Sequence, residues 1–166
     1  MIIRKAERKD LPALLEIYNY EVIHGVATLD LSPKTMSEWE KWFDEHNTGN
    51  HPLFVAETEE HVAGYVSLSS YREKEAYRST VELSLYVGVA DRKKGIATAL
   101  MQYILEEAKK DADTHTVVSV ITAGNEASKK LHQKFGFTYC GTIKEVGFKL
   151  GAYRDIENYS LTVSSL

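Results

Sequence analysis

The residues best suited to chemistry lie in a short basic turn between two segments of different periodicity. Residues 80–87 alternate like a strand, and residues 95–109 carry an apolar stripe at helical spacing. The turn contains Arg92, Lys93, Lys94 and Gly95. Free N–H groups at a helix N-terminus, the helix dipole and nearby cations favour an anion such as a pyrophosphate, which glycine lets the backbone approach closely. The segment therefore predicts a phosphate-binding turn, and an ordinary turn with solvated charges fits it equally well.

A second segment of chemical interest, 125–137, follows one predicted strand further along the chain. It reads Asn-Glu-Ala-Ser-Lys-Lys-Leu-His-Gln-Lys-Phe-Gly-Phe. Together the two segments resemble the GCN5-related N-acetyltransferase (GNAT) superfamily. The basic turn matches the acetyl-CoA signature Arg/Gln-x-x-Gly-x-Gly/Ala at Arg92, Gly95 and Ala97. The second segment matches the pattern Asn-x-x-Ala/Ser-x-x-Leu-Tyr/His-x-x-x-Gly-Phe at Asn125, Ser128, Leu131, His132, Gly136 and Phe137. Each match alone is weak, but both in this order, with a strand between them, make a strong resemblance.

A narrower resemblance covers nearly the whole chain. Residues 71–82 and 145–155 look like two runs of the phosphinothricin and methionine sulfoximine acetyltransferase branch, Arg-x-x-x-x-Tyr/Phe-Arg-x-Thr-Val-Glu and Val-Gly-x-Lys-x-Gly-x-x-x-Asp. The sequence departs from the branch at Leu83, where many relatives have His, and at Ala152 and Tyr153, where a basic residue and Trp are usual. These departures concern the acceptor and leave the transfer chemistry intact.

The resemblance implies an α/β protein with the GNAT fold, in which a single mixed, mostly antiparallel β-sheet is flanked by α-helices. It implies one N-acetyltransferase domain over residues 1–166 and acetyl-CoA as co-substrate, without a metal. The implied acetyl-CoA contacts are Leu85, Tyr86, Val87, Arg92, Lys93, Lys94, Gly95, Ile96, Ala97, Asn125 and Ser128. The N–H groups of Leu85 and Val87 would hold the thioester carbonyl and the pantetheine arm, unless an uninterrupted sheet ladder occupies them.

Acetyl transfer from a thioester to an amine needs a base for the amine and a proton for the leaving thiolate. Glu82, which the resembling fold places at the centre of the sheet, is the candidate base and is expected to act through a water molecule. The alternative is a structural carboxylate paired to an arginine. His132 stands where many relatives carry a Tyr that protonates the thiolate, and the alternative is a packed core histidine.

The acceptor is expected to bind the charged loop before residue 80. Arg72 and Arg78 flank Tyr77 there, and a guanidinium fork suits the two oxygens of a carboxylate or phosphinate. These residue types therefore predict an amino-acid-like acceptor, and a solvated loop is the alternative. Thr28 is expected to line the same pocket.

Other chemistries find little support in the sequence. Neither GxxxxGK(S/T) nor GxGxxG occurs, which argues against a P-loop NTPase and a Rossmann dehydrogenase. The six histidines show no HxxxH or HExxH spacing, so no metal site is expected. Cys140 is the single cysteine and has no histidine close to it in sequence, so it is not expected to accept the acyl group. One thiol also indicates a reducing compartment, the cytoplasm.

Apolar periodicity and turn residues predict the elements that position these side chains. Strands are expected at 2–5, 53–57, 62–69, 80–87, 117–121, 139–148 and 155–163. Helices are expected from the N-cap Asp10 to about residue 24, then at 36–46, 95–109 and 125–134, the last stopped by Gly136. Trp39 and Trp42 are expected to serve hydrophobic packing. The order β-α-α-β-β-β-α-β-α-β-β predicts a mixed sheet covered by helices.

Composition limits the classes of partner. The 166 residues carry a net charge of −4, so no basic excess favours a nucleic acid or an anionic membrane, and no apolar run could span a bilayer. The sequence therefore predicts acetyl-CoA-dependent N-acetylation of a small amino-acid analogue, such as phosphinothricin or methionine sulfoximine, by direct transfer in a ternary complex. The branch implies a homodimer. Two alternatives stay open: acetylation of a peptide or protein N-terminus, and a non-catalytic acyl-CoA-binding sensor, against which Glu82 and His132 speak.

Overall fold

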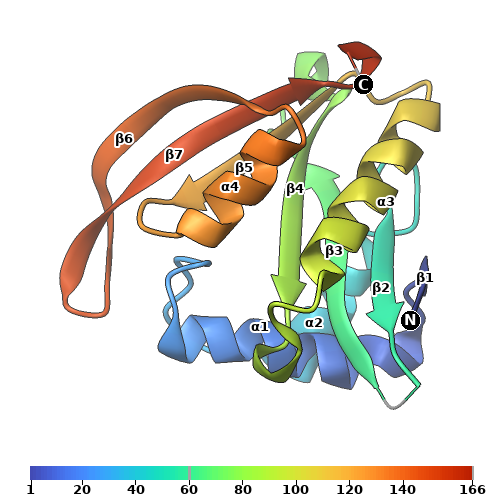
Figure 1. Cartoon of the computed structure of the whole chain (residues 1–166), viewed down its shortest axis with the longest axis vertical. Coiled ribbons are helices and arrows are strands. Elements are labelled where there is room, and N and C mark those ends of the chain that lie inside the picture. The colour runs from blue at the N-terminus through green and yellow to red at the C-terminus, as the bar shows by residue number, and fades with distance from the viewer. Residues whose placement is uncertain (60, 166) are drawn as a thin grey trace.

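The computed structural model describes residues 1–59 and 61–165, which form a seven-stranded sheet with helices on both faces (Figure 1). The strands are β1 (Ile2–Lys5), β2 (Leu53–Glu57), β3 (Val62–Ser70), β4 (Thr80–Val87), β5 (Thr116–Thr122), β6 (Thr138–Lys149) and β7 (Ala152–Thr162). The α-helices are α1 (Leu11–His24), α2 (Met36–Asp44), α3 (Ile96–Lys110) and α4 (Glu126–Lys134). The spatial order of the strands is β1-β2-β3-β4-β5-β7-β6.

The predicted fold class and element order are confirmed. All neighbouring strands pair antiparallel except β4 and β5, which run parallel, so the sheet is mixed and mostly antiparallel. The clearest differences are at the C-terminal hairpin, where β7 begins at Ala152 instead of residue 155. Strand β6 turns directly into β7 there, and the pairing of Lys149 with Ala152 extends both strands to the turn.

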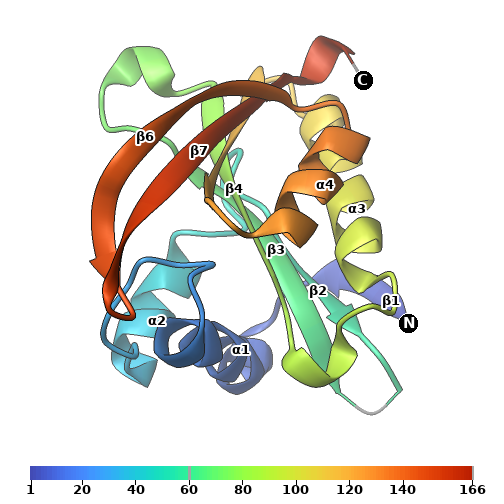
Figure 2. The same ribbon diagram turned by 60° about the vertical axis from the view of Figure 1, so that its left-hand side comes forward.

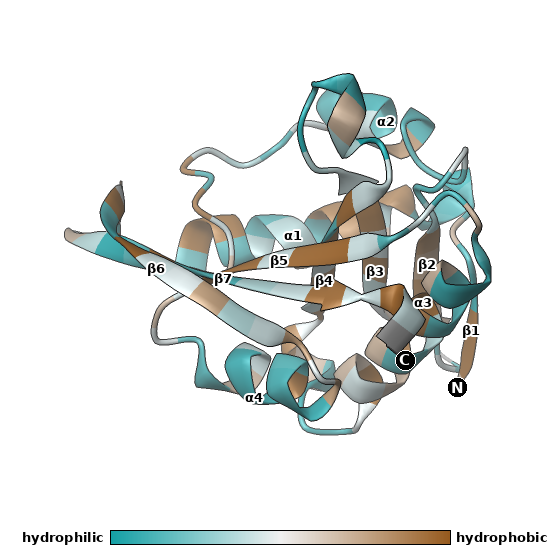
Figure 3. Ribbon diagram, turned by 90° about the horizontal axis from the view of Figure 1, so that it is seen from above, coloured by the Kyte–Doolittle hydropathy of each residue, from teal (hydrophilic) through white to brown (hydrophobic). Residues whose placement is uncertain are grey.

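Two apolar cores hold the helices against opposite faces of the sheet (Figures 2 and 3). Helix α3 packs on one face through residues such as Leu100 and Ile104, against Val81 and Leu83 of β4. Helices α1 and α2 pack on the other face, where Leu14 and Trp39 meet strands β2 and β3. Side chains alternate along a strand, so successive residues of β4 face different helical layers.

The sheet opens in its middle, between β4 and β5. The parallel ladder joins Thr80 to Thr116 and ends at the pair Glu82 and Val118. Beyond that pair, β4 continues beside β3 as far as Val87, while β5 continues beside β7, so the two strands diverge (Figure 1). This divergence leaves one edge of β4 without a partner strand near the centre of the molecule.

Asp10 precedes α1 as predicted, but its side chain does not cap the helix. Its carboxylate accepts hydrogen bonds from the Arg4 guanidinium at 2.8 and 2.9 Å and from the Glu7 N–H at 2.7 Å. Arg4 also binds Glu57 of β2. Leaving a buried carboxylate without a cationic partner costs more free energy than leaving a helix N-terminus without a side-chain cap. Asp10 therefore binds Arg4 and so connects the start of α1 to the edge of the sheet.

Strands β6 and β7 form a long hairpin that projects beyond the helices (Figures 1 and 3). Large apolar side chains on it are exposed to solvent: Tyr139, Ile143, Val146, Phe148, Leu150 and Tyr153. Phe148 and Tyr153 are register partners whose rings contact each other, so part of this apolar surface lies on one face of the hairpin. Within the described residues, no helix is both long and apolar enough to cross a bilayer.

Candidate active site

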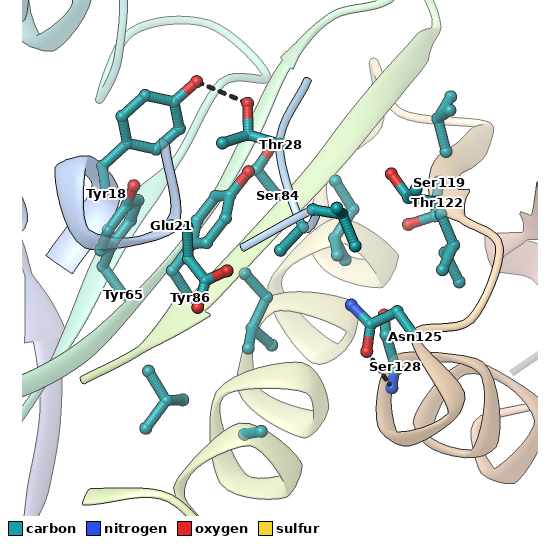
Figure 4. A pocket seen from close by; sticks show the side chains of 18 of the residues that line it. Tyr18, Glu21, Thr28, Tyr65, Ser84, Tyr86, Ser119, Thr122, Asn125 and Ser128 are labelled. Atoms are coloured by element: carbon teal, nitrogen blue, oxygen red, sulfur yellow. Dashed lines mark hydrogen bonds between the residues drawn. The ribbon is translucent and has the colours of Figure 1, made fainter. Parts of the chain in front are cut away.

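A cavity of about 1280 Å³ opens where β4 and β5 diverge. Its walls come from α1 and the loop after it, α2, strands β3 to β5, the basic turn before α3, and α4. Figure 4 shows Tyr18, Glu21, Tyr65 and Tyr86 on one side of this cavity and Ser119, Thr122, Asn125 and Ser128 on the other. The fold thus brings the two sequence motifs and the first helix, which are far apart along the chain, to one shared cavity.

The basic turn borders the cavity through most of its residues. Arg92, Lys93, Gly95, Ile96 and Ala97 line it. Gly95 is the N-cap of α3 with φ 81°, a left-handed conformation that suits glycine, and the first N–H groups of the helix have no intrahelical acceptor. Lys94 is not among the lining residues, and its ammonium pairs with Asp91 at 3.2 Å. Asp91 also accepts from His61 at 2.6 Å, and these two partners lower the pKa of its carboxyl.

Arg92 is bound to Glu21 of α1. One terminal nitrogen of its guanidinium donates to the Glu21 carboxylate, and the group lies 5.9 Å from the centre of the Tyr20 ring. Gly25 keeps space for this ion pair, because a side chain there would collide with the Glu21 carboxylate. The pair joins α1 to the basic turn and neutralises one of the turn's cations.

The unpaired edge of β4 forms the floor of the cavity. Leu85, Tyr86 and Val87 line it, and all three lie beyond Glu82, where the ladder to β5 ends. An uninterrupted ladder is therefore absent at these residues. Backbone N–H and C=O groups along this edge can bind a ligand that carries amides of its own.

Glu82 lies at the last paired position of β4, next to the opening. Val81 and Leu83 face the α3 core, so Glu82 faces the layer of α1 and α2. Burial raises the pKa of the Glu82 carboxyl above its usual value. Among the described residues no arginine pairs with Glu82, so the alternative of a structural carboxylate paired to an arginine is not observed. A carboxyl with a raised pKa inside a cavity suits proton abstraction.

His132 lies on the opposite side of the opening, on α4, and only 4% of its surface is exposed. Its Nδ1 is 2.7 Å from the carbonyl oxygen of Ser128, and its Nε2 is 2.8 Å from the hydroxyl oxygen of Ser119. The ring also packs edge-on against Phe137. Burial lowers the pKa of the imidazole, so the ring is neutral at neutral pH. His132 is thus a packed side chain that also lines the cavity.

Asn125 and Ser128 stand at the start of α4. Asn125 is the N-cap, and its side-chain oxygen accepts from the Ser128 N–H at 3.3 Å. Both residues line the cavity across from the basic turn. The N-terminus of α4 therefore offers a second set of free N–H groups to a ligand in the opening.

Thr28 lines the cavity from the loop after α1, as expected. Its hydroxyl is 2.9 Å from that of Tyr18, which also donates to Asp30. The buried ammonium of Lys149 donates to the carbonyl oxygens of Thr28 and Glu21, at 2.7 and 3.2 Å. Lys149 thereby fastens the β6–β7 hairpin to the loop that carries Thr28.

The structure does not bring Arg72, Tyr77 and Arg78 to the cavity that holds Glu82. They line a separate cavity of about 270 Å³, together with Asn50, which precedes β2, and further residues of the loop before β4. Arg72 lies over the rings of Tyr71 and Tyr77, at 5.0 and 5.7 Å from their centres. The physical reason is the direction of β4: this loop precedes the paired end of the strand, whereas the cavity opens beyond Glu82.

Aromatic side chains form the wall of the cavity on the α1 and α2 side, and of these the sequence analysis did not single out Tyr65. Trp39 and Trp42 stack with ring centres 4.4 Å apart, as the packing prediction requires, but they also line the cavity. Tyr65 and Tyr86 are register partners on β3 and β4 and lie beside them. Trp39 Nε1 and the Tyr65 hydroxyl are buried without a hydrogen-bond partner among the described residues. Two buried donors without acceptors point to polar groups on a ligand or to water.

Comparisons with known proteins agree with this geometry. Residues 3–157 match the model of the acetyltransferase (GNAT) domain family. The chain is 36% identical over 155 residues to an L-methionine sulfoximine/L-methionine sulfone acetyltransferase of Pseudomonas aeruginosa, which covers 93% of this chain and 90% of the relative.

Two solved structures have nearly the same fold. One is a GNAT superfamily phosphinothricin acetyltransferase from Sinorhizobium meliloti in complex with acetyl-CoA, with TM-score 0.93, 31% identity, and coverage of 97% of this chain and 87% of that chain. The other is a ribosomal-protein-alanine N-acetyltransferase from Brucella melitensis, with TM-score 0.93, 37% identity, and coverage of 98% and 99%. With its divided sheet, basic turn and matched family model, this chain belongs to the GNAT acetyltransferase family.

Proposed function

We propose that the protein is an acetyl-CoA-dependent N-acetyltransferase whose acceptor is the amine of a small amino-acid analogue of the methionine sulfoximine or phosphinothricin type. The observation that carries the proposal is the opening between β4 and β5, with Glu82 on one face and His132 on the other. This arrangement separates a base for the amine from the groups near the leaving thiol. It allows direct transfer between two bound substrates, without an acyl-enzyme.

The residues around the opening fit acetyl-CoA. The pantetheine arm contains amides, and the edge of β4 from Leu85 to Val87 presents unpaired backbone groups that suit them. The pyrophosphate suits the N-terminus of α3, with Lys93 beside it. Asn125 and Ser128 would line the arm from the other side. The acetyl carbon then lies near Glu82, where the strands separate.

Glu82 would remove a proton from the acceptor ammonium, through a water molecule. Its raised pKa makes the carboxylate a stronger base than an exposed glutamate, and it faces the same layer as the aromatic wall. The neutral amine can then attack the thioester carbonyl from that face. The thiolate leaves on the other face, where Ser119 and His132 lie.

The acceptor would occupy the cavity between Thr28 and the aromatic wall. Trp39 Nε1 and the Tyr65 hydroxyl supply hydrogen-bond donors there, and Lys34 lines the same side as a cation for a carboxylate or phosphinate. A role of Arg72, Tyr77 and Arg78 in binding the acceptor has less support, since they line a different cavity.

The test is a turnover assay with acetyl-CoA over amino acids, sulfoximines, phosphinothricin, polyamines and peptides. We expect the highest kcat/KM for an amino-acid analogue with a carboxylate, and we expect saturating acetyl-CoA to raise Tm because it binds only the folded chain. Turnover confined to amines without a carboxylate would contradict the acceptor class. An unchanged Tm would contradict the co-substrate.

A protein or peptide N-terminus is the second candidate acceptor. The observation that favours it is the similarity to the ribosomal-protein-alanine N-acetyltransferase. Peptides that begin with alanine belong in the same assay, and a kcat/KM for them above that of methionine sulfoximine would select this function. Tight acetyl-CoA binding without turnover of any amine would instead select a sensor.

We also propose a homodimer that works in the cytoplasm. The exposed apolar side chains of the β6–β7 hairpin, among them Phe148 and Tyr153, support an interface between two copies. The single cysteine fits a reducing compartment. Light scattering measures the mass in solution, and Phe148→Asp together with Tyr153→Asp should give a monomer if this surface is the interface.

A further inference from the structure

The Nε2 atom of the cavity-lining His132 contacts the hydroxyl of Ser119. A backbone carbonyl can only accept, so the 2.7 Å contact with the Ser128 oxygen fixes the ring hydrogen on Nδ1. In the neutral ring Nε2 then accepts, and the hydroxyl of Ser119, 2.8 Å away, donates to it. An imidazole has no third polar position. The Ser128 hydroxyl is farther from the ring, 3.4 Å from Nδ1. A proton that enters or leaves the ring at Nε2 therefore passes through the oxygen of Ser119.

Ser119 lies where β4 and β5 separate, at the opening of the cavity. It directly follows Val118, the last residue of β5 that pairs with β4. Residues two apart on a strand share a face, so Ser119 faces the same side as Val117 and Ile121 of the α3 core. That side is opposite to the one that Glu82 faces. Figure 4 shows it on the β5 and α4 side of the cavity, near Thr122.

The sulfur belongs on the same face as Ser119. The arm of acetyl-CoA must run from the basic turn, which leads into α3, past the N-terminus of α4 to the opening. The sulfur is the last atom of that arm before the acetyl group. The amine arrives from the face of Glu82, so the bond to sulfur breaks on the side of Ser119 and His132.

We propose that Ser119 is a catalytic residue that shuttles a proton between the reacting atoms and His132; this inference rests on the proposed function. When the amine has added to the carbonyl, a proton leaves its nitrogen and crosses the opening by way of a water molecule to the Ser119 oxygen, while the hydroxyl proton of Ser119 moves to His132 Nε2. When the carbon–sulfur bond breaks, His132 returns that proton to Ser119, which gives one to the sulfur. One N–H bond is exchanged for one S–H bond, and His132 begins and ends neutral.

A purely structural role for Ser119 is the alternative, in which its hydroxyl only supplies the hydrogen-bond donor that the buried His132 Nε2 needs. The two roles predict different effects of substitution on Tm and kcat. A serine with only a structural role affects Tm and leaves kcat unchanged. A serine in the proton path affects kcat, leaves the KM for acetyl-CoA unchanged, and makes its effect depend on His132.

The experiment compares Ser119→Ala, His132→Phe and the double variant with the wild type. We expect each single change to lower kcat by about 10²-fold, the scale of acid–base catalysis, with the KM for acetyl-CoA unchanged. The double variant should be no slower than the slower single variant, because both changes interrupt one path. Ser67→Ala is the matched control, since Ser67 is a fully buried serine outside the cavity lining, and it should keep the wild-type kcat.

Two further variants keep the test decisive if Ser119→Ala folds poorly. Ser119→Thr and Ser119→Val have the same shape and differ by the hydroxyl, so the Thr enzyme should be faster by at least about tenfold. Equal kcat for this pair, wild-type kcat in Ser119→Ala, or single defects that multiply in the double variant would each overturn the inference. Failure of the proposed function would show earlier, as a wild-type protein that acetylates no amine.

Discussion

The ammonium of Lys149 donates to the carbonyl oxygen of Thr28 across 2.7 Å, and it is buried where it does so. Through this contact the hairpin at the end of the chain holds the loop that follows the first helix. Burial lowers the pKa of Lys149, which shows that the protein keeps a cation at a cost in solvation. Two hydrogen bonds offset that cost: the ammonium is a donor to the Thr28 carbonyl and a second donor to the Glu21 carbonyl, which also accepts from the Gly25 N–H at 3.0 Å.

Replacing Lys149 should therefore loosen the acceptor side of the cavity. Lys149→Met keeps the length of the side chain but removes the side-chain donor to the Thr28 carbonyl, which costs about 1–3 kcal/mol, while the Glu21 carbonyl keeps its bond from the Gly25 N–H. We expect a lower Tm and a higher KM for the acceptor, with little change in the KM for acetyl-CoA. Lys144→Met, on the exposed part of the same strand, is the control and should change none of these.

Glu82→Gln should abolish most of the activity without weakening acetyl-CoA binding. The amide keeps the shape of the side chain and removes the base, so kcat/KM at neutral pH should fall by about 10²–10⁴-fold. Because the base must be ionised, the wild-type rate should fall as pH drops through the raised pKa of Glu82, and the variant should lack this acid limb. A variant with the wild-type pH–rate profile would remove Glu82 from the mechanism.

The same substitution should stabilise the free protein at neutral and alkaline pH. The folded-state pKa of Glu82 is raised above its unfolded value, so its contribution to stability is fully present below the unfolded pKa and is lost as pH rises through the folded pKa. Glutamine carries no charge at any pH. Tm measured from pH 4 to pH 8 should thus show the difference, Glu82→Gln minus wild type, growing with pH; a constant difference would show that burial does not oppose ionisation here.

Glu21→Gln should strengthen acetyl-CoA binding. The Glu21 carboxylate now pairs with Arg92 at the edge of the phosphate-binding turn. Without that negative charge the guanidinium is free to attract the pyrophosphate, so titration calorimetry should give a lower Kd. The gain should shrink at high salt, where exposed charges are screened. Arg92→Ala removes the cation and should raise the Kd of acetyl-CoA. An equal Kd for the wild type, Glu21→Gln and Arg92→Ala would show that this ion pair does not affect acetyl-CoA binding at the turn.

Tyr65→Phe should raise the KM of the acceptor alone. The hydroxyl is buried and has no partner among the described residues, so its removal should leave the Tm of the free protein unchanged or higher. If an acceptor oxygen binds it, the variant loses that hydrogen bond, and acceptor KM should increase severalfold while acetyl-CoA KM stays constant. Tyr139→Phe, on the exposed hairpin, serves as the control.

Sequence patterns predicted the elements well because the deciding signals are local. The stripe with Leu100 and Ile104 determines a helix on one face of the sheet, and the alternation of Val81, Glu82 and Leu83 determines which side chain points away from it. The glycine at position 95 marks where α3 begins, and its positive φ agrees with that role. Each signal spans only a few residues.

The predicted site was less complete, because its missing parts depend on contacts between distant segments. The pairing of Glu21 with Arg92 joins residues that are 71 positions apart, and no pattern in the sequence indicates it. Ser119 lies between apolar neighbours in β5, and only the folded structure, in which α4 places His132 beside it, indicates a role for its hydroxyl. The arginine loop before β4 lines a separate cavity, whereas the large cavity opens beyond Glu82, and no local pattern in the sequence indicates that separation. Its role in binding the acceptor stays a prediction.

The divided sheet gives acetyl-CoA a second effect, on the lifetime of the protein. A sheet that lacks a central row of hydrogen bonds is weakest there, and amides along the free edge of β4 exchange with solvent and open to proteases first. A ligand lodged between the strands takes the place of the missing row and closes that route. We therefore expect saturating acetyl-CoA to slow both amide exchange along this edge and proteolysis of the protein.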